Sequence, residues 1–207
     1  MKSIQLLLFI LLLGTFSCRK NQASETSPNN NIASDTTLTS TTLFFDITID
    51  GNRDFHVTQQ DGYLMGNGTM QPPVVPGFLL FSIGNSSFTS SLRVQRGLFY
   101  NLNPVDSVYN ETIRLLSPAT LAYLNLVSNT SGVILEWRDA SGNTWNTVQG
   151  SGNQDGSQFK ITEMQTLQVA PTVQSVIFAA TFNCTLYDGA GKIKKLTKGR
   201  LRMQTWI

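Results

Sequence analysis

Histidine and cysteine are scarce in this chain, with one histidine and two cysteines among 207 residues. A Ser-His-Asp site would have to use His56, but no G-x-S-x-G segment is present to expose a nucleophilic serine. A zinc site is equally hard to build, because His56 and Cys184 are the only available nitrogen and sulfur ligands beyond the N-terminal segment. We therefore expect no metal, no cofactor and no enzymatic activity, with His56 in a structural role.

Charged residues are also few, at 14% of the chain, and their signs nearly cancel. Without Lys2, which lies in the N-terminal signal described below, 15 − 1 = 14 basic side chains face 13 acidic ones. A near-neutral chain lacks the strong positive field that wholesale nucleic-acid binding requires. Nucleic acid is therefore not an expected partner.

Long apolar runs are absent, because the longest run, Leu6–Leu13, is well short of the roughly 20 residues that a spanning helix needs. This run follows Lys2 and precedes small and polar residues, which is the layout of a secretory signal. Residues 1–17 are therefore interpreted as a signal peptide that takes no part in the fold.

Cys18 follows this signal directly and precedes Arg19 and Lys20. A bacterial lipoprotein signal is cut before a cysteine whose sulfur has received a diacylglycerol, and Ser17-Cys18 fits such a site. Thr15 and Phe16 depart from the usual leucine and small residue of that pattern. We interpret Cys18 as the lipid attachment site; the alternative is an ordinary signal that happens to carry a cysteine. Each buried acyl methylene contributes about 0.8 kcal/mol, so several chains would anchor the protein durably.

Residues 18–41 are rich in serine, threonine and asparagine and nearly free of large apolar side chains. Such a composition cannot bury enough surface to offset the entropy lost on ordering. We expect a disordered tether here, followed by one folded domain over residues 42–207.

Apolar and polar residues alternate in this domain with the period of two that indicates half-buried β-strands. Gly51–Asn52 is expected to turn the first strand into the second, Phe88 to face inward, and Thr197–Gly199 to form a turn before the last strand. Residues 70–77 hold three prolines and are expected to form an extended loop. The expected strands cover residues 43–50, 54–59, 78–83, 88–94 and 200–207.

A short helix is expected near residues 117–125. Ser117 can act as its N-cap and Pro118 suits the first helical position. Strand alternation through Leu124 and Leu126 competes with this interpretation.

The segment from Glu136 to Trp145 predicts a β-hairpin. Its loop, Ala140–Gly142, has glycine at the third place, where a three-residue hairpin requires a left-handed backbone. This register places Trp137 opposite Trp145, which is a favourable cross-strand pair.

Cys184 falls in the alternating stretch from Val176 to Leu186. It shares its parity with the apolar residues there, so it is expected to be a small buried side chain and not a nucleophile or metal ligand.

A basic cluster gathers much of the positive charge near the C-terminus. Its function could be to meet an anionic polysaccharide, a lipid headgroup or an acidic partner. Lysines on an edge hairpin also deter aggregation between sheets, and this structural role is favoured. The cluster consists of Lys192, Lys194, Lys195, Lys198, Arg200 and Arg202.

The C-terminal part of the chain resembles small cell-envelope lipoproteins of the Bacteroidetes whose function is unknown. The similarity rests on the lipoprotein signal and on about the last 65 residues, from Trp145 through GSGNQDGSQFKIT to VIFAATFNCTLYDGAGKIKKLTKGRLRM, with a closing T-x-G-x-x strand. The resemblance implies an exported, lipid-anchored β-protein and brings no catalytic residues.

Many short strands without a βαβ rhythm predict an all-β fold, a single antiparallel β-sandwich or barrel-like domain. We expect a lipid-anchored protein of the cell envelope, in the outer membrane, that is a non-enzymatic binding or structural module. One alternative is a carbohydrate-binding accessory protein in which Trp137, Trp145 and Trp206 stack on sugars. The other is a hydrolase that assembles a carboxylate pair in space.

Overall fold

The computed structural model describes residues 38–70, 77–99, 105–124, 132–171 and 173–206. The described chain forms one antiparallel sheet of 11 strands that folds over on itself, with a single helix. The predicted all-β sandwich-like domain is therefore confirmed. Residues 1–41, apart from Leu38–Thr41, and most of the proline-rich segment 70–77 lie outside the described residues, and with them the expected signal, Cys18 and most of the tether.

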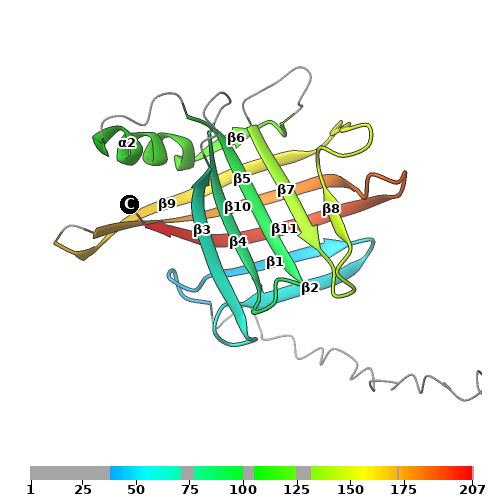
Figure 1. Cartoon of the computed structure of the whole chain (residues 1–207), viewed down its shortest axis with the longest axis horizontal. Coiled ribbons are helices and arrows are strands. Elements are labelled where there is room, and N and C mark those ends of the chain that lie inside the picture. The colour runs from blue at the N-terminus through cyan, green and yellow to red at the C-terminus, as the bar shows by residue number, and fades with distance from the viewer. Residues whose placement is uncertain (1–37, 71–76, 100–104, 125–131, 172, 207) are drawn as a thin grey trace, which may run out of the picture. The chain divides into compact units, whose positions relative to one another are not determined.

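The strands follow one another in the order β2-β1-β11-β10-β8-β7-β5-β4-β3, while β9 pairs with β10 and with β6. In Figure 1, β3, β4, β5 and β7 lie in front and cross the layer formed by β9, β10, β11, β1 and β2. The element bounds are β1 Phe44–Ile49, β2 Asn52–Val57, β3 Tyr63–Met70, β4 Gly77–Asn85, β5 Ser91–Phe99, α2 Val105–Leu116, β6 Ala119–Leu121, β7 Gly132–Arg138, β8 Thr144–Asn146, β9 Gln158–Ala170, β10 Val173–Tyr187 and β11 Ile193–Trp206.

Between β10 and β8 the two layers are joined by one residue pair, Tyr187 with Asn146. The side chain of Gln154 reinforces this corner by donating to the carbonyls of Thr147 and Thr185 at 3.1 and 2.7 Å. It also accepts the Thr185 amide at 3.1 Å, so backbone groups left unpaired at the corner are satisfied.

The core lies between the layers and is built from alternate residues of each strand. Phe81 of the front layer contacts Phe178 of the back layer edge-on, with ring centroids 4.8 Å apart. The largest fully buried side chains are Phe45, Phe81, Phe159, Phe178, Ile47, Leu79, Ile83, Leu92, Leu116, Leu135, Ile161 and Leu186.

The predicted tryptophan hairpin is confirmed. Trp137 pairs with Trp145 between β7 and β8, and Gly142 has the expected positive φ of 80°. Asp139 holds the turn, because its side chain accepts the amides of Ser141 and Asn143. This register was predictable because a short turn fixes it locally.

Two other strand details differ from the expectation. The β1–β2 turn is Asp50–Gly51, one residue earlier than expected, since both residues have the positive φ of a two-residue hairpin loop and Ile49 pairs with Asn52. Phe88 does not face inward; it lies in the β4–β5 turn with φ 52° and is 38% exposed.

The helix expected near 117–125 is wrong in position. The helix of the structure, α2, ends at Leu116, and residues 119–121 form strand β6. Ser117 does not cap a new helix; its hydroxyl donates to the carbonyl of Ile113 in the last turn of α2, at 2.8 Å. A Ser-Pro pair can stand at the beginning or just after the end of a helix, because proline cannot continue one.

Arg96 of β5 fixes the end of α2. Its buried guanidinium donates from Nε to the Leu115 carbonyl at 3.2 Å and from Nη1 to the carbonyls of Gly97 and Gly132 at 2.7 and 3.3 Å. Cations at a helix C-terminus interact favourably with its dipole. No helix in the described part of the chain is long and apolar enough to cross a membrane.

Candidate functional site

A hollow of about 600 Å³ opens on the outer face of β1, β11, β10 and β9, away from the core side of these strands. Most of its lining residues are polar, and its charged members are one carboxylate and three cations. The lining residues are Asp46, Thr48, Arg53, Gln158, Thr181, Phe182, Asn183, Lys198, Gly199 and Arg200.

A β-bulge in β11 shapes this hollow. β10 pairs Phe182 with Gly199 and Cys184 with Leu196, so three residue steps on β11 oppose two on β10. Lys198 occupies the extra position with φ 52°, a left-handed conformation that costs a non-glycine residue about 1–2 kcal/mol. The expected turn at Thr197–Gly199 is therefore wrong, because β11 runs without a break from Ile193 to Trp206.

The position of the bulge depends on the glycine that follows it. A Cβ built on Gly199 would lie 2.5 Å from the Phe182 ring, so the absence of a side chain lets that ring pack against the β11 backbone. Phe182 in turn stacks on Phe159, with ring centroids 5.5 Å apart. The bulge thus remains anchored to the core while Lys198 stays at the surface.

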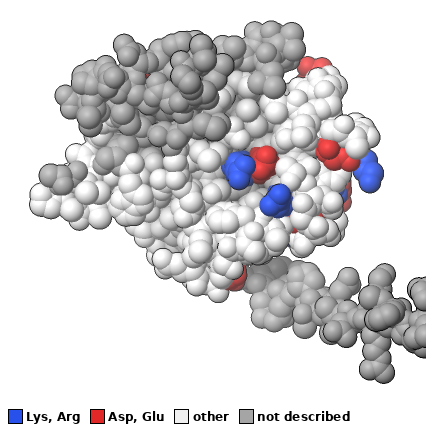
Figure 2. All heavy atoms as spheres, viewed as in Figure 1, with Lys and Arg blue, Asp and Glu red and all other residues white. Residues whose placement is uncertain are grey.

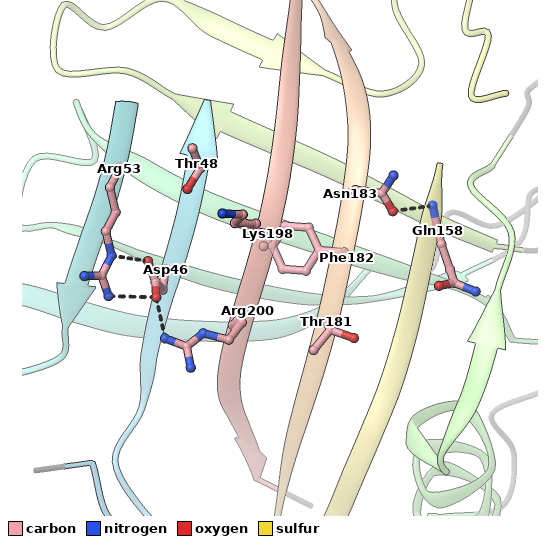
Figure 3. A pocket seen from close by; sticks show the side chains of 10 residues that line it. Asp46, Thr48, Arg53, Gln158, Thr181, Phe182, Asn183, Lys198 and Arg200 are labelled. Carbon is pink, nitrogen blue, oxygen red and sulfur yellow. Dashed lines mark hydrogen bonds and ion pairs between the residues drawn. The ribbon is translucent and has the colours of Figure 1, made fainter. Parts of the chain in front are cut away.

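Asp46 organises the cationic side of the hollow (Figure 3). Arg53 of β2 donates from Nε to its Oδ1 and from Nη2 to its Oδ2, at 2.8 and 2.9 Å. Arg200 of β11 donates from Nη2 to Oδ2 at 2.6 Å. The carboxylate is 8% exposed, whereas Arg53 and Arg200 are 37% and 39% exposed, so both guanidiniums are fixed in place with part of their surface open to solvent.

Asp46 stays ionised in this setting. Burial by itself would raise the pKa of its carboxyl, but the hydrogen bonds and charges of Arg53 and Arg200 outweigh burial and lower the pKa below 3.8. The described lining holds three cations and this single carboxylate, a net charge of 3 − 1 = +2. The hollow therefore attracts anions.

Lys198 is the cation of the hollow that no side chain neutralises. It is exposed, and no hydrogen bond or ion pair joins its side chain to another residue in the described part of the chain. Since its backbone is also in a costly conformation, packing does not explain this lysine. Non-glycine residues held in such conformations cluster at functional sites.

The other basic residues of the cluster are mostly paired. Lys194 lies 3.5 Å from Asp50, Lys195 donates to the Thr185 hydroxyl at 2.7 Å, and Arg202 lies 3.3 Å from Glu163. β11 runs between β1 and β10, so these residues do not lie on an edge hairpin. The edge-protection interpretation is therefore wrong for β11.

The tryptophans proposed for ligand stacking do not form one exposed surface, because Trp137 and Trp145 pair with each other but are buried. Trp137 and Trp145 are 9% and 7% exposed, and the Lys194 ammonium lies 4.8 Å from the centroid of the Trp145 ring. Trp206 is 51% exposed at the far end of β11. Of the three, Trp206 alone presents an accessible ring, and it lies outside the hollow.

His56 takes part in a contact network between layers. Its Nε2 lies 2.7 Å from Oδ1 of Asp54, whose Oδ2 accepts the indole N–H of Trp137 at 2.9 Å. The imidazole stacks on Tyr63, with centroids 3.7 Å apart. Asp54 thus ties β2 to β7, and none of the hydrogen bonds of the described residues joins His56 to a hydroxyl or thiol.

Cys184 is a buried free cysteine, as the strand pattern predicts. Burial raises the pKa of its thiol to about 12, so almost no thiolate is present at neutral pH. The described residues contain no group of three or more His, Cys, Asp or Glu that could hold a metal ion.

Comparisons with protein-family models, with curated proteins and with solved structures found no match. The hollow was not anticipated from the sequence as a site, although Lys198 and Arg200 belong to the basic cluster and Gly199 to the expected turn. One signal was available: Leu196 and Leu201 are both buried but five residues apart, and this odd spacing requires one inserted residue between them.

Proposed function

We propose that this protein is a lipid-anchored, non-enzymatic binding module of the cell envelope, and that the hollow around Lys198 binds an acidic glycan. The signal-like residues 1–17 and Cys18 support the anchored location. The observation that carries the binding role is a lysine in a left-handed bulge, without a side-chain partner among the described residues, set beside two arginines that share one carboxylate.

Besides its cations, the hollow has uncharged hydrogen-bonding groups. These groups favour an anion that carries hydroxyl groups over a simple inorganic anion. Thr48 and Thr181 supply hydroxyl groups, and Gln158 supplies an exposed side-chain amide. Arginines and lysine bind carboxylate, sulfate or phosphate groups, while hydroxyls and amides hydrogen-bond to sugar hydroxyls. An open polar hollow of this kind suits a segment of a polymer better than a small enclosed ligand.

The geometry also weighs against a carboxylate-pair hydrolase at this site. Asp46 is the only carboxylate among the described lining residues, and two arginines hold it ionised. A general acid needs a raised pKa and a second carboxylate nearby, and the hollow provides neither.

Titration with a short oligogalacturonate, compared with its neutral galactose counterpart, tests the proposal. We expect saturable binding of the acidic oligomer that weakens with salt, and about a tenfold loss of affinity, ~1.4 kcal/mol, in Lys198→Gln. Lys192→Gln removes a charge from the exposed β10–β11 turn and should leave affinity unchanged. Equal binding of the neutral oligomer, equal losses in both variants, or binding only to anionic lipid vesicles would reject an acidic-glycan site in the hollow.

A further inference from the structure

Three strands project beyond the rest of the domain at the left of Figure 1. β1 pairs with β11 only as far as Arg202, and β6 pairs with β9 only as far as Ile161. Past these points, β9, β10 and β11 pair only with one another among the described residues. We call this end the tongue; it consists of residues 165–170, 173–174 and 206, whereas Val176, Phe178 and Met203 at its base still belong to the core.

The end of the tongue carries no charged side chain. The sequence has no aspartate, glutamate, lysine, arginine or histidine between Glu163 and Asp188, and none after Arg202. Figure 2 shows no charged side chain on the described atoms of this end, although charged groups appear elsewhere on the same face. This distribution is unusual for a solvent-exposed hairpin, where charged residues normally prevail.

Apolar side chains are exposed at the same place. Val169, Val173 and Trp206 are 52%, 37% and 51% exposed. Trp206 pairs with Ser175, which has the same parity on β10 as Val173, so Trp206 and Val173 lie on one face of the tongue. Tryptophan with aliphatic neighbours and no charge is the composition found where proteins enter the membrane–water interface.

We infer that the tip of the tongue rests in the interface of the bilayer to which Cys18 is anchored; this inference rests on the lipid anchor proposed above. Nineteen residues, 19–37, lie between Cys18 and the described domain, so Leu38 stays within about 70 Å of an acylated cysteine. The domain begins at the base of the tongue, because the Thr39 carbonyl accepts a hydrogen bond from Arg202 at 2.9 Å. Tethering raises the effective concentration of the tip at the bilayer, so a weak individual contact suffices.

This arrangement orients the hollow. Lys198 precedes Trp206 by eight residues on β11, which corresponds to about 25 Å along the strand. With the tip at the bilayer, the hollow faces material beyond the headgroup layer, where a glycan polymer is accessible and a lipid headgroup of the same membrane is not.

The test couples the mature chain, beginning at Cys18, to vesicles of neutral lipid that carry a maleimide headgroup. Cys18 is the reactive thiol, because Cys184 is buried and its thiol is almost wholly protonated. Brominated acyl chains in the same vesicles quench tryptophan on contact. Of the three tryptophans, Trp206 is the exposed one, and Trp137 and Trp145 serve as a constant background.

We expect brominated vesicles to quench part of the emission and to shift the remaining spectrum, an effect absent in Trp206→Phe. The pair Val169→Ser and Val173→Ser should reduce the quenching strongly, while Ile193→Ser, an even more exposed apolar site at the opposite end of β11, should not. Coupling in vitro keeps this result independent of whether cells acylate Cys18 and of glycan binding. Three results would overturn the inference. They are an absence of quenching, quenching that the two serine substitutions leave unchanged, and protection of Trp206 by concentration-dependent dimerisation.

Discussion

The carboxylate of Asp46 lies 2.6 Å from Nη2 of Arg200, its partner across the β1–β11 pair. Because Arg53 occupies the other side of the same carboxylate, one buried anion joins three neighbouring strands, β2, β1 and β11. The cluster therefore serves the fold and the hollow together: it holds the sheet beside the bulge and presents two guanidiniums at fixed positions.

Acid should weaken the fold through Asp46. Its pKa is lower in the folded protein than its ordinary 3.8, so its contribution is complete above that value and is lost as pH falls through the folded pKa. Asp46→Asn should cost about 2 kcal/mol at neutral pH, less than a fully buried pair because both arginines are partly exposed. Urea unfolding at a series of pH values from about 6 to 2 measures this.

Part of the acid sensitivity should remain in Asp46→Asn. Burial would raise the pKa of Asp139, but hydrogen bonds from Asn143, Trp145 and Ser141 lower it. Asp139 therefore also contributes stability that is lost as pH falls. A variant whose stability depends on pH as steeply as wild type between about pH 5 and 2 would contradict the role assigned to Asp46.

Gly199→Ala should destabilise the protein by about 1–3 kcal/mol, because the new methyl group would meet the Phe182 ring at 2.5 Å. Gly68→Ala is the matched control, since nothing lies within 4 Å of a Cβ at that strand position. Chemical denaturation of both variants measures the difference. Similar free energies of unfolding would show that the bulge does not depend on a bare backbone at 199.

Cys184→Ala should cost about 1–2 kcal/mol as a small truncation in the core, with glycan affinity unchanged. The native thiol should also resist an alkylating reagent at pH 8, because burial raises its pKa to about 12. Mass spectrometry after alkylation, with and without denaturant, checks the second point. Rapid labelling of the native protein would show that the thiol is accessible.

Cys18→Ser should release the protein from membrane fractions, and a clickable fatty acid should label wild type alone. Fractionation of cells that express each form, followed by detection of the label, measures both. A labelled Cys18→Ser protein, or unmodified soluble wild type, would remove the anchor from which the orientation of the tongue is inferred.

Local features of this fold were predictable, and features that depend on partner strands were not. The tryptophan hairpin followed from three loop residues, and the burial of Cys184 followed from its parity in one strand. Thr197–Gly199 resembles a turn in isolation; it becomes a bulge because β1 and β10 pair with β11 on both sides of it. Tertiary pairing thus decided between two local structures with the same residue preferences.

The helix and the cationic hollow also differ in whether a local sequence pattern could have predicted them. Thr112, Leu115 and Leu116 have the spacing of one helix face, a signal before the Ser-Pro pair at 117–118 that the sequence interpretation did not use. By contrast, Asp46, Arg53 and Arg200 are separated by as many as 154 positions, and no local pattern brings them together. Their meeting requires the strand order β2-β1-β11.

Lys198→Gly tests the binding role of the hollow most directly, because stability and affinity should change in opposite directions. Glycine accepts the left-handed backbone at this position, so the free energy of unfolding should rise by about 0.5–1 kcal/mol. Affinity for oligogalacturonate should fall about tenfold with the loss of the ammonium group. Urea unfolding and titration of the same preparation measure both quantities. A more stable Lys198→Gly protein that binds oligogalacturonate as tightly as wild type would contradict the assignment of the hollow as the binding site.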